Sequence, residues 1–151
     1  MKRLTFGVVA VTLLIIVGTS HGQSLGLTAP ESVTVPSGTL RLTGLIWRPS
    51  GSGRFPAILF SHGNARKPTN AEILGPVFAR HGYVFLYLFR RGNGLSGDQS
   101  PFFGDLINRE RQSNGPEAAE RLAAQLLATD YLDDTIAGLS FLRSRPNVVS
   151  T

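Results

Sequence analysis

Hydrophobic residues follow two patterns along this chain, and the first is an alternation with polar residues. It occupies residues 31–36 and 40–48, which are separated by the turn-forming sequence Pro36-Ser37-Gly38. A period of two is typical of a strand with one buried face, and two such strands joined by a tight turn form an antiparallel hairpin. The pattern therefore predicts a hairpin at the edge of a sheet.

The second pattern is a continuous apolar run, which occurs at residues 57–60 and again at residues 83–89. Strands that are buried on both faces of a parallel sheet have this composition. A helix is expected between the two runs, because four apolar residues there share one helical face: Ile73, Leu74, Val77 and Phe78. Strand, helix and strand in this order predict a parallel βαβ unit.

The ends and the middle of that helix carry their own signals. Thr69 followed three residues later by Glu72 is a capping-box start, and Gly82 is suited to end the helix in a left-handed conformation. Pro76 has no N–H group to donate, so we expect either a kink or two short helices.

The rest of the chain is expected to be a polar loop followed by helix. The loop extends to Gly115, and an Ala- and Leu-rich helical segment then covers residues 116–145. Thr129-Asp130 could cap a second segment, so the pattern leaves open one broken helix or two. Residues 148–151 look like the approach to a further strand. The complete pattern predicts an α/β fold with an antiparallel N-terminal hairpin, a parallel βαβ unit and a long C-terminal helical segment.

The N-terminus resembles a secretory signal peptide. Lys2 and Arg3 are basic, residues 4–18 are apolar apart from two threonines, and Ser20 and Gly22 are small residues at the positions that a signal peptidase reads. The sequence therefore predicts an exported protein, periplasmic or extracellular.

These signals also predict the domain boundaries: a signal peptide over residues 1–22, a linker over residues 23–30 and a folded domain over residues 31–151. The alternative is an uncleaved N-terminal membrane anchor, which is the one case in which we expect a membrane partner. The apolar run is shorter than the ~20 residues that a membrane span usually needs.

Composition excludes several kinds of chemistry. Cysteine is absent, which excludes disulfides and thiol catalysis, and the three histidines have no His-x-x-x-His spacing, so we expect no metal site. The formal net charge of +5 falls to +3 without Lys2 and Arg3. No basic patch with interleaved aromatic residues is visible, so we expect no nucleic-acid partner.

Gly92, Gly94 and Gly97 match the G-x-G-x-x-G pattern of dinucleotide-binding loops. That pattern functions only where the glycines open a helix whose N-terminus meets the pyrophosphate. Residues 98–104 contain Pro and Gly and have no helical period. The sequence therefore predicts no nucleotide and no other cofactor.

Three segments resemble the N-terminal half of an α/β-hydrolase of the dienelactone hydrolase and prolyl-oligopeptidase-like kind. Residues 56–64 look like the family's third strand and its His-Gly turn, and residues 81–96 are similar to its fourth strand with the following R-G-x-G-x-S run. Residues 132–148 look like the helix that precedes the nucleophile strand. Phe89 departs from the pattern, because many relatives carry Asp there. The resemblance covers residues 31–149 and implies a partial α/β-hydrolase sheet.

The resemblance implies an oxyanion-binding turn at His62, Gly63 and Asn64. A backbone N–H group of Gly63, Asn64 or Ala65 would donate a hydrogen bond to the charge that develops in acyl transfer. Gly63 has no side chain, which allows a substrate to approach the backbone closely. His62 is expected to be a supporting residue rather than a general base.

A second loop is expected beside this turn, with Arg91, Gly92 and Gly94 as its residues near the site. A purely structural role, turn formation plus an ion pair, is the simpler interpretation of Arg91 and Gly92.

The family's nucleophile elbow, G-x-S-x-G, does not occur in these 151 residues. Ser96 and Ser140 lie in incomplete matches, and Ser61 has only its neighbour His62 as a possible base. We therefore interpret the chain as the N-terminal portion of an exported serine hydrolase that cleaves small-molecule esters or peptide-like substrates through an acyl-enzyme. It would carry the oxyanion turn but not the nucleophile, acid or base, and would be inactive alone. The alternative is a non-catalytic envelope protein that uses the half-fold to bind a ligand or partner.

Overall fold

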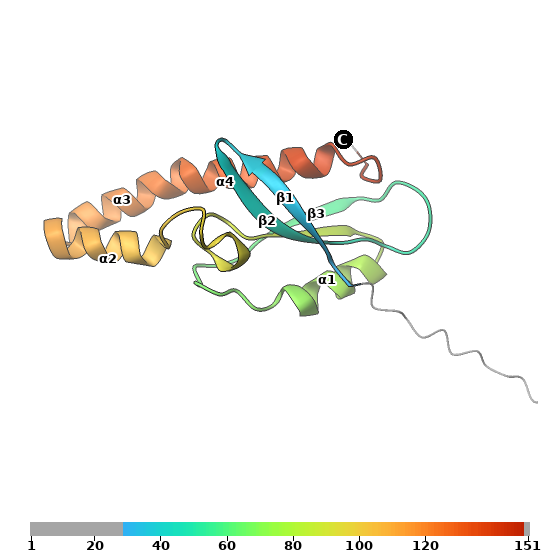
Figure 1. The fold of residues 1–151 in the computed structure, drawn as a ribbon, viewed down its shortest axis with the longest axis horizontal. Helices are drawn as coiled ribbons and strands as arrows, with labels where there is room; N and C mark the ends of the chain where they lie inside the picture. Colours follow the sequence, from blue (N-terminus) through green and yellow to red (C-terminus); the bar gives the residue numbers. More distant parts are fainter. Residues whose placement is uncertain (1–28, 150–151) are drawn as a thin grey trace, which may run out of the picture.

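The computed structural model describes residues 29–149, and its strands form one mixed sheet (Figure 1). The strands lie in the order β1-β2-β4-β3, with bounds β1 (Glu31–Ser37), β2 (Leu40–Trp47), β3 (Ala57–Ser61) and β4 (Val84–Leu88). β1 pairs antiparallel with β2, β2 pairs antiparallel with β4, and β3 is parallel to β4. The predicted edge hairpin and the predicted parallel pair are confirmed, whereas the predicted signal peptide lies outside the described residues.

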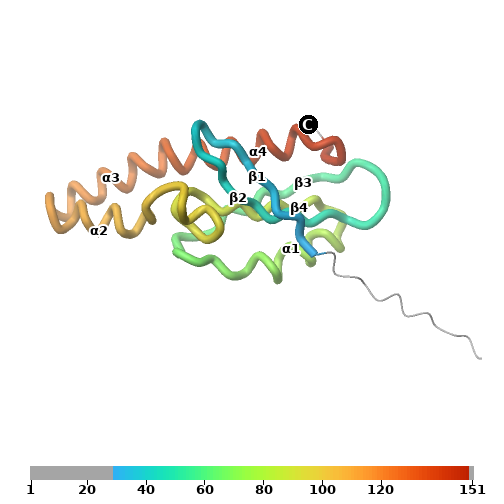
Figure 2. Tube along the Cα trace, viewed as in Figure 1, coloured from blue at the N-terminus to red at the C-terminus, as the bar shows by residue number. Residues whose placement is uncertain are grey.

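Helices cover both faces of this sheet. Their bounds are α1 (Ala71–Arg80), α2 (Phe103–Asn114), α3 (Pro116–Ala128) and α4 (Asp130–Arg143), with a short 3-10 turn at Gly94–Ser96. α1 lies on one face and α4 on the other, while α2 and α3 run side by side and extend beyond the sheet (Figures 1 and 2). None of the helices between residues 29 and 149 is long and apolar enough to cross a membrane.

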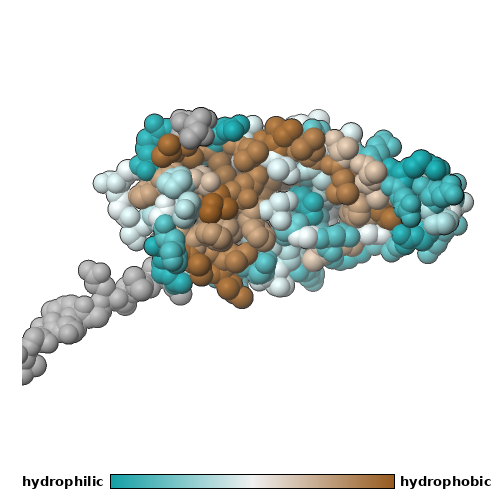
Figure 3. All heavy atoms as spheres, turned by 180° about the vertical axis from the view of Figure 1, so that it is seen from behind, coloured by the Kyte–Doolittle hydropathy of each residue, from teal (hydrophilic) through white to brown (hydrophobic). Residues whose placement is uncertain are grey.

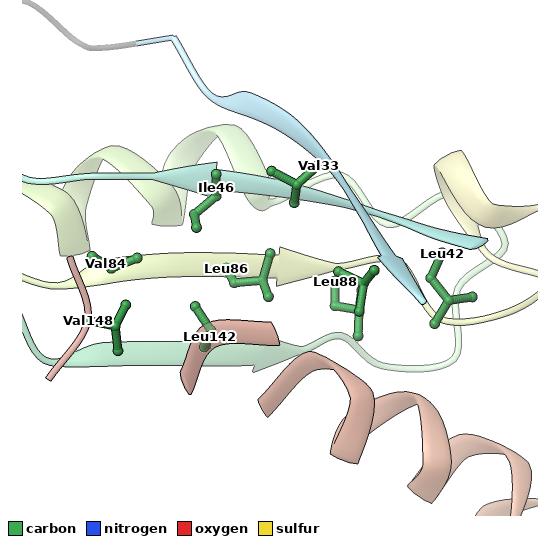
Figure 4. Close-up of a cluster of buried hydrophobic side chains, with 9 residues drawn as sticks. Val33, Leu42, Ile46, Val84, Leu86, Leu88, Leu142 and Val148 are labelled. Atoms are coloured by element: carbon green, nitrogen blue, oxygen red, sulfur yellow. The ribbon is translucent and has the colours of Figure 1, made fainter. Parts of the chain in front are cut away.

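β4 is the centre of the core, because its side chains alternate between the two faces and none is more than 2% exposed. The residues facing α4 pack in one cluster with side chains of β1, β2 and α4: Val84, Leu86 and Leu88 with Val33, Leu42, Ile46 and Leu142 (Figure 4). The residues facing α1 form a second, aromatic cluster: Phe85 and Tyr87 with Trp47 and Phe89. A strand buried on both faces accounts for the continuous apolar run in its sequence.

β3 has the same kind of apolar run, but the prediction that it is buried on both faces is wrong. Its residues Ala57 to Phe60 are only half-buried, because β3 is the last strand in the sheet order. The rear view shows hydrophobic residues gathered over this edge, between α4 above and α1 below (Figure 3).

An isolated bridge lies beside the start of β3, at one end of this edge. Phe55 and Val148 form a parallel bridge, in which the Phe55 N–H donates to the Asn147 carbonyl and the Val149 N–H donates to the Phe55 carbonyl, each at 2.9 Å. This bridge is consistent with an approach to another strand, which stays a prediction.

The predicted capping box at the start of α1 is wrong. α1 begins at Ala71 after Asn70, and no side-chain hydrogen bond caps it. It is also one helix through Pro76 rather than two short ones. The predicted C-terminal end is confirmed, because Gly82 has a φ of +84° and its N–H donates to the Ala79 carbonyl.

The predicted loop up to Gly115 is also wrong, because residues 103–114 form α2. Ile107 is the one buried residue of this helix, and its large apolar residues, Phe103, Leu106 and Ile107, are confined to its first half, so no apolar stripe runs along the whole helix. Contact with α3 stabilises it instead. The break between α3 and α4 falls at Thr129 as expected, although the Thr129 hydroxyl donates back to the Gln125 carbonyl and does not cap α4.

Candidate functional site

Two loops meet where the parallel strands β3 and β4 end. The Asn93 side-chain amide donates to the Ala65 carbonyl at 2.7 Å, and the Gly94 N–H donates to the Arg66 carbonyl at 2.8 Å. Asn93 is only 1% exposed, so this contact is shielded from water. The loop after β4 therefore holds the loop after β3, at the edge of an α/β sheet where ligands usually bind.

Two glycines allow the loop after β4 to take its shape. Gly92 has a φ of +74°, and a Cβ atom on it would lie 2.5 Å from the Pro101 carbonyl oxygen. Gly94 has a φ of +49°, and a Cβ atom there would lie 2.3 Å from the Phe89 ring. Both positions require glycine for conformation and for space, which gives a structural reason for two of the three glycines in the G-x-G-x-x-G pattern.

His62 is buried inside the turn after β3 and is 4% exposed. Its Nδ1 donates to the Gly63 carbonyl at 2.8 Å, while its Nε2 accepts from the backbone N–H of Arg90 at 3.3 Å. These two partners define a neutral ring with its hydrogen on Nδ1. Burial lowers the pKa of His62, which also favours the neutral form. Both ring nitrogens are occupied, so neither is free to take a proton from Ser61.

Arg90 lies directly beneath the same turn, and the sequence analysis missed its importance. Its Nη2 donates to the His62 carbonyl at 2.9 Å and reaches the Gly63 carbonyl at 3.4 Å. Its guanidinium also stacks over the Tyr131 ring at 5.1 Å. Burial lowers the pKa of Arg90. A cation placed directly after a buried strand was the available sequence signal, because such a residue is near the end of the neighbouring parallel strand.

These contacts fix the direction of the backbone in the turn. In a trans peptide the N–H points away from the carbonyl of the same unit, so the Gly63 N–H is opposite the His62 carbonyl and the Asn64 N–H is opposite the Gly63 carbonyl. Both carbonyls are bonded from the protein side, by Arg90 and the His62 ring. The Gly63 and Asn64 N–H groups therefore point outward.

The N–H groups of the three candidate positions, Gly63, Asn64 and Ala65, differ in whether they already donate a hydrogen bond. The Ala65 N–H is occupied, since it donates to the Gly63 carbonyl at 3.0 Å. For the Gly63 and Asn64 N–H groups, no acceptor is found among residues 29–149. Both residues are exposed. Of the three candidate positions for the predicted donor, Gly63 and Asn64 therefore keep a free N–H group and Ala65 does not.

A groove of about 330 Å³ borders this turn, with walls formed by the end of β3 and the segment that leads to α1. Its lining residues are Phe60, His62, Gly63, Ala65, Lys67, Pro68, Thr69 and Asn70. They include one cation, Lys67, and no carboxylate, so the groove favours a neutral or negatively charged ligand.

Arg91 is bound by α4 and not by the turn. Its guanidinium forms ion pairs with Asp134 at 2.7 Å and Asp130 at 3.1 Å, and its backbone N–H donates to Asp134 at 3.0 Å. Asp134 is completely buried and also accepts a hydrogen bond from the Ser37 hydroxyl at 2.8 Å. These contacts join β1, the loop after β4 and α4, which is the structural role considered for Arg91 from the sequence.

The three serines of the sequence analysis lie apart in the fold. Ser61 is exposed at the end of β3, and Ser140 is exposed on α4. Ser96 is buried, where its hydroxyl donates to the Phe89 carbonyl and accepts from the Thr43 N–H, both at 2.8 Å. None of the three hydrogen-bonds a histidine within the described part of the chain. The same part contains no cluster of three or more His, Asp or Glu residues that could hold a metal ion.

Comparison with known proteins supports the fold but not a particular activity or substrate. No protein-family model and no curated protein sequence matches the chain. The acylaminoacyl peptidase of Pyrococcus horikoshii is a similar solved structure, with 21% identity and a TM-score of 0.51 over 80% of this chain. A second structure, named m3DLH, matches with 18% identity and a TM-score of 0.48 over 80% of the chain.

The chain spans 17% of the length of the peptidase and 45% of the length of m3DLH. The likeness to the peptidase, together with the mixed sheet and its parallel β3–β4 pair, shows an α/β fold related to that of the α/β-hydrolases.

Proposed function

We propose that this chain is the N-terminal part of an exported serine hydrolase that cleaves ester or amide bonds, and that it contributes part of the oxyanion-binding site. The observation that carries the proposal is the pair of outward N–H groups at Gly63 and Asn64, in a turn that borders an open groove through His62, Gly63 and Ala65. Acyl transfer passes through a tetrahedral intermediate whose oxyanion needs such donors, and removal of one donor costs about 3 kcal/mol.

The open edge of β3 supports the same proposal. Asn147 to Val149 already run parallel to the chain at Phe55, so a strand that continued from Val149 would lie along β3 and end beside the turn. A strand in this place would deliver its following residues to the Gly63 and Asn64 N–H groups. That is the arrangement that a nucleophile elbow requires.

The substrate is proposed to be a small ester or a peptide-like amide, bound in the groove beside Phe60 and Pro68. This proposal follows from the chemistry of an oxyanion site and from the size of the groove. For localisation, we propose that the protein is released after export. The alternative is that an uncleaved N-terminus retains it at a membrane.

The test compares the 151-residue chain with a longer version of the protein that contains a G-x-S-x-G sequence after Thr151. We expect a fluorophosphonate probe to label one serine of the longer protein and none of the shorter chain. Labelling of the shorter chain at Ser61, Ser96 or Ser140 would contradict the proposal. If the longer protein were also inert, a non-catalytic envelope protein that binds a ligand in the groove would replace the enzyme.

A sharper test removes one donor. Asn64→Pro eliminates the Asn64 N–H, so kcat of the longer protein should fall about 10²- to 10³-fold. Asn64→Ala is the matched control, because it retains the N–H and removes only an exposed side chain. Equal loss in both variants would show that the N–H group is not the donor.

A further inference from the structure

We infer that Arg90 is a positioning residue, which holds the turn at residues 62–64 so that the Gly63 and Asn64 N–H groups face a ligand. This inference rests on the proposed function and adds to it a residue outside the turn itself.

The contacts of Arg90 match this role. One nitrogen, Nη2, donates to the His62 carbonyl at 2.9 Å and lies 3.4 Å from the Gly63 carbonyl. The backbone N–H of Arg90 donates to the His62 ring at 3.3 Å. The side chain thus holds two successive carbonyls, and the backbone holds the ring between them. Rotation of either peptide would break at least one of these hydrogen bonds.

Arg90 is itself held in place by its surroundings. Its guanidinium stacks on Tyr131, which is 4% exposed, and its carbonyl accepts the N–H of Asn93 at 3.0 Å. Its Nε atom is buried and has no hydrogen-bond partner among the described residues. The stacking and the two carbonyls therefore set the position of the guanidinium. A lysine ammonium cannot reproduce a planar group that stacks and donates sideways at once.

The charge of Arg90 adds a second effect. A guanidinium that donates to a carbonyl polarises the peptide unit, which strengthens the N–H on its other side as a donor. A positive charge directly behind the turn also attracts a negative charge in front of it. Asp134 interacts electrostatically with Arg90, but it is also paired with Arg91, so its charge is shared between two guanidinium groups. Arg90 therefore favours an oxyanion over a neutral carbonyl at the turn.

The first experiment uses amide exchange measured by NMR on the 151-residue chain. In the wild type we expect the Ala65 amide, which is bonded to the Gly63 carbonyl, to be protected, and the Gly63 and Asn64 amides to exchange freely. Arg90→Gln should shift the Gly63 and Asn64 resonances. It should also lower the protection of the Ala65 amide against exchange about tenfold, which corresponds to the loss of one hydrogen bond worth ~1.4 kcal/mol. Arg90→Lys should give a smaller change in the same direction.

Arg145→Gln is the matched control. Arg145 also stacks on an aromatic ring, at 5.2 Å from Phe141, and also has a buried Nε atom without a partner among the described residues. It lines a different groove, next to Phe55 and beyond the other end of β3. We expect it to leave the turn resonances unchanged. Unchanged Ala65 protection in Arg90→Gln, or an equal change in Arg145→Gln, would overturn the inference. If Arg90→Gln does not fold, Arg90→Lys and Tyr131→Leu decide the question by the same readout.

The second experiment measures kcat and KM for an activated ester with the longer protein. A misplaced donor lowers kcat, so Arg90→Gln should reduce kcat about 10²-fold while KM changes little, and Arg90→Lys should recover part of the loss. A longer protein that is active but unaffected by Arg90→Gln would overturn the inference alone. A longer protein that is inert before any substitution would overturn the proposed function, while the exchange data would still decide whether Arg90 holds the turn.

Discussion

At the scale of single residues, Asp134 is the most completely buried charge in the described part of the chain, with none of its side chain exposed. It accepts hydrogen bonds from Ser37 and from both the backbone and the side chain of Arg91. Asp134→Asn would leave the guanidinium of Arg91, which is 14% exposed, without its main counter-charge. We expect a loss of about 3 kcal/mol in the free energy of unfolding, measured by urea denaturation.

Asp133→Asn is the control for this substitution, because the neighbouring Asp133 is exposed. Its effect should stay within about 0.5 kcal/mol. Equal losses in the two variants would mean that the buried ion pair contributes nothing specific to stability.

His62 provides a prediction about pH. Burial lowers its pKa in the folded protein below the ordinary value of 6.5, so the unfolded chain binds the proton more readily. The stability from neutral His62 is fully present above pH 6.5 and is lost as the pH falls from 6.5 towards the folded-state pKa. The slope is at most about 1.4 kcal/mol per pH unit.

His62→Gln should remove this part of the pH dependence, because glutamine can donate and accept hydrogen bonds but does not titrate in this range. Thermal unfolding between pH 5 and pH 8 measures it, and His81→Gln, at an exposed histidine, is the control. An identical pH profile for His62→Gln and the wild type would rule out a neutral buried His62.

The most important contacts of the candidate site could not be predicted from sequence, because they join residues that are far apart along the chain. The sequence gives Arg91 and the turn glycines as candidates through the family resemblance. The partners of Arg90 and Arg91 are separated from them by 28 and 43 residues. No local pattern marks Asp134 as the partner of Arg91, since an adjacent aspartate occupies position 133.

At the scale of elements, α1 approaches the sheet so closely that its middle residue must be glycine. A Cβ atom on Gly75 would lie 2.2 Å from the Trp47 ring, which is 2% exposed. Gly75→Ala improves helix propensity by about 1 kcal/mol, but overpacking against a buried ring costs about 1–3 kcal/mol and displaces the helix. We expect net destabilisation, visible as a lower denaturation midpoint.

Gly138→Ala on α4 is the matched control. Its new Cβ atom would meet the flexible end of Leu88 at 2.9 Å, which can move aside more easily than a tryptophan ring. Its loss of stability should be smaller than that of Gly75→Ala. The reverse order would show that the α1 face of the core adapts more readily than the α4 face.

The elements that sequence predicted well are those whose pattern reflects their burial. β4 is apolar throughout because both of its faces are covered, and Pro116 begins α3 as expected. α2 was missed because its partner is another helix rather than the core, so Ile107 is the sole buried position in its sequence. β3 was predicted as a strand but not as an exposed edge, because an apolar run does not reveal which neighbour is absent.

At the scale of the whole molecule, hydrophobic residues are exposed on the side where the sheet ends. Leu132, Ile136 and Leu139 form a stripe on α4 with exposures of 48%, 51% and 39%. Thr135, on the same side of α4, lines a small hollow together with Leu59 to Ser61 of β3. The stripe and the edge of β3 therefore belong to one apolar face (Figure 3). Such a face promotes self-association unless further chain covers it.

The double substitution Ile136→Glu and Leu139→Glu tests what covers this face. In the 151-residue chain both side chains are exposed, so we expect less binding of a hydrophobic dye and less self-association, with the free energy of unfolding changed by less than about 1 kcal/mol. In a longer protein with a strand added along β3, the same stripe would be covered, and buried glutamates would then destabilise the fold by several kcal/mol. Leu127→Glu, at a residue of α3 that is 52% exposed, is the control and should have little effect in either protein. Equal tolerance of the double substitution in both proteins would show that the added chain leaves this face open, and would remove the support that the sheet edge gives to the proposed hydrolase.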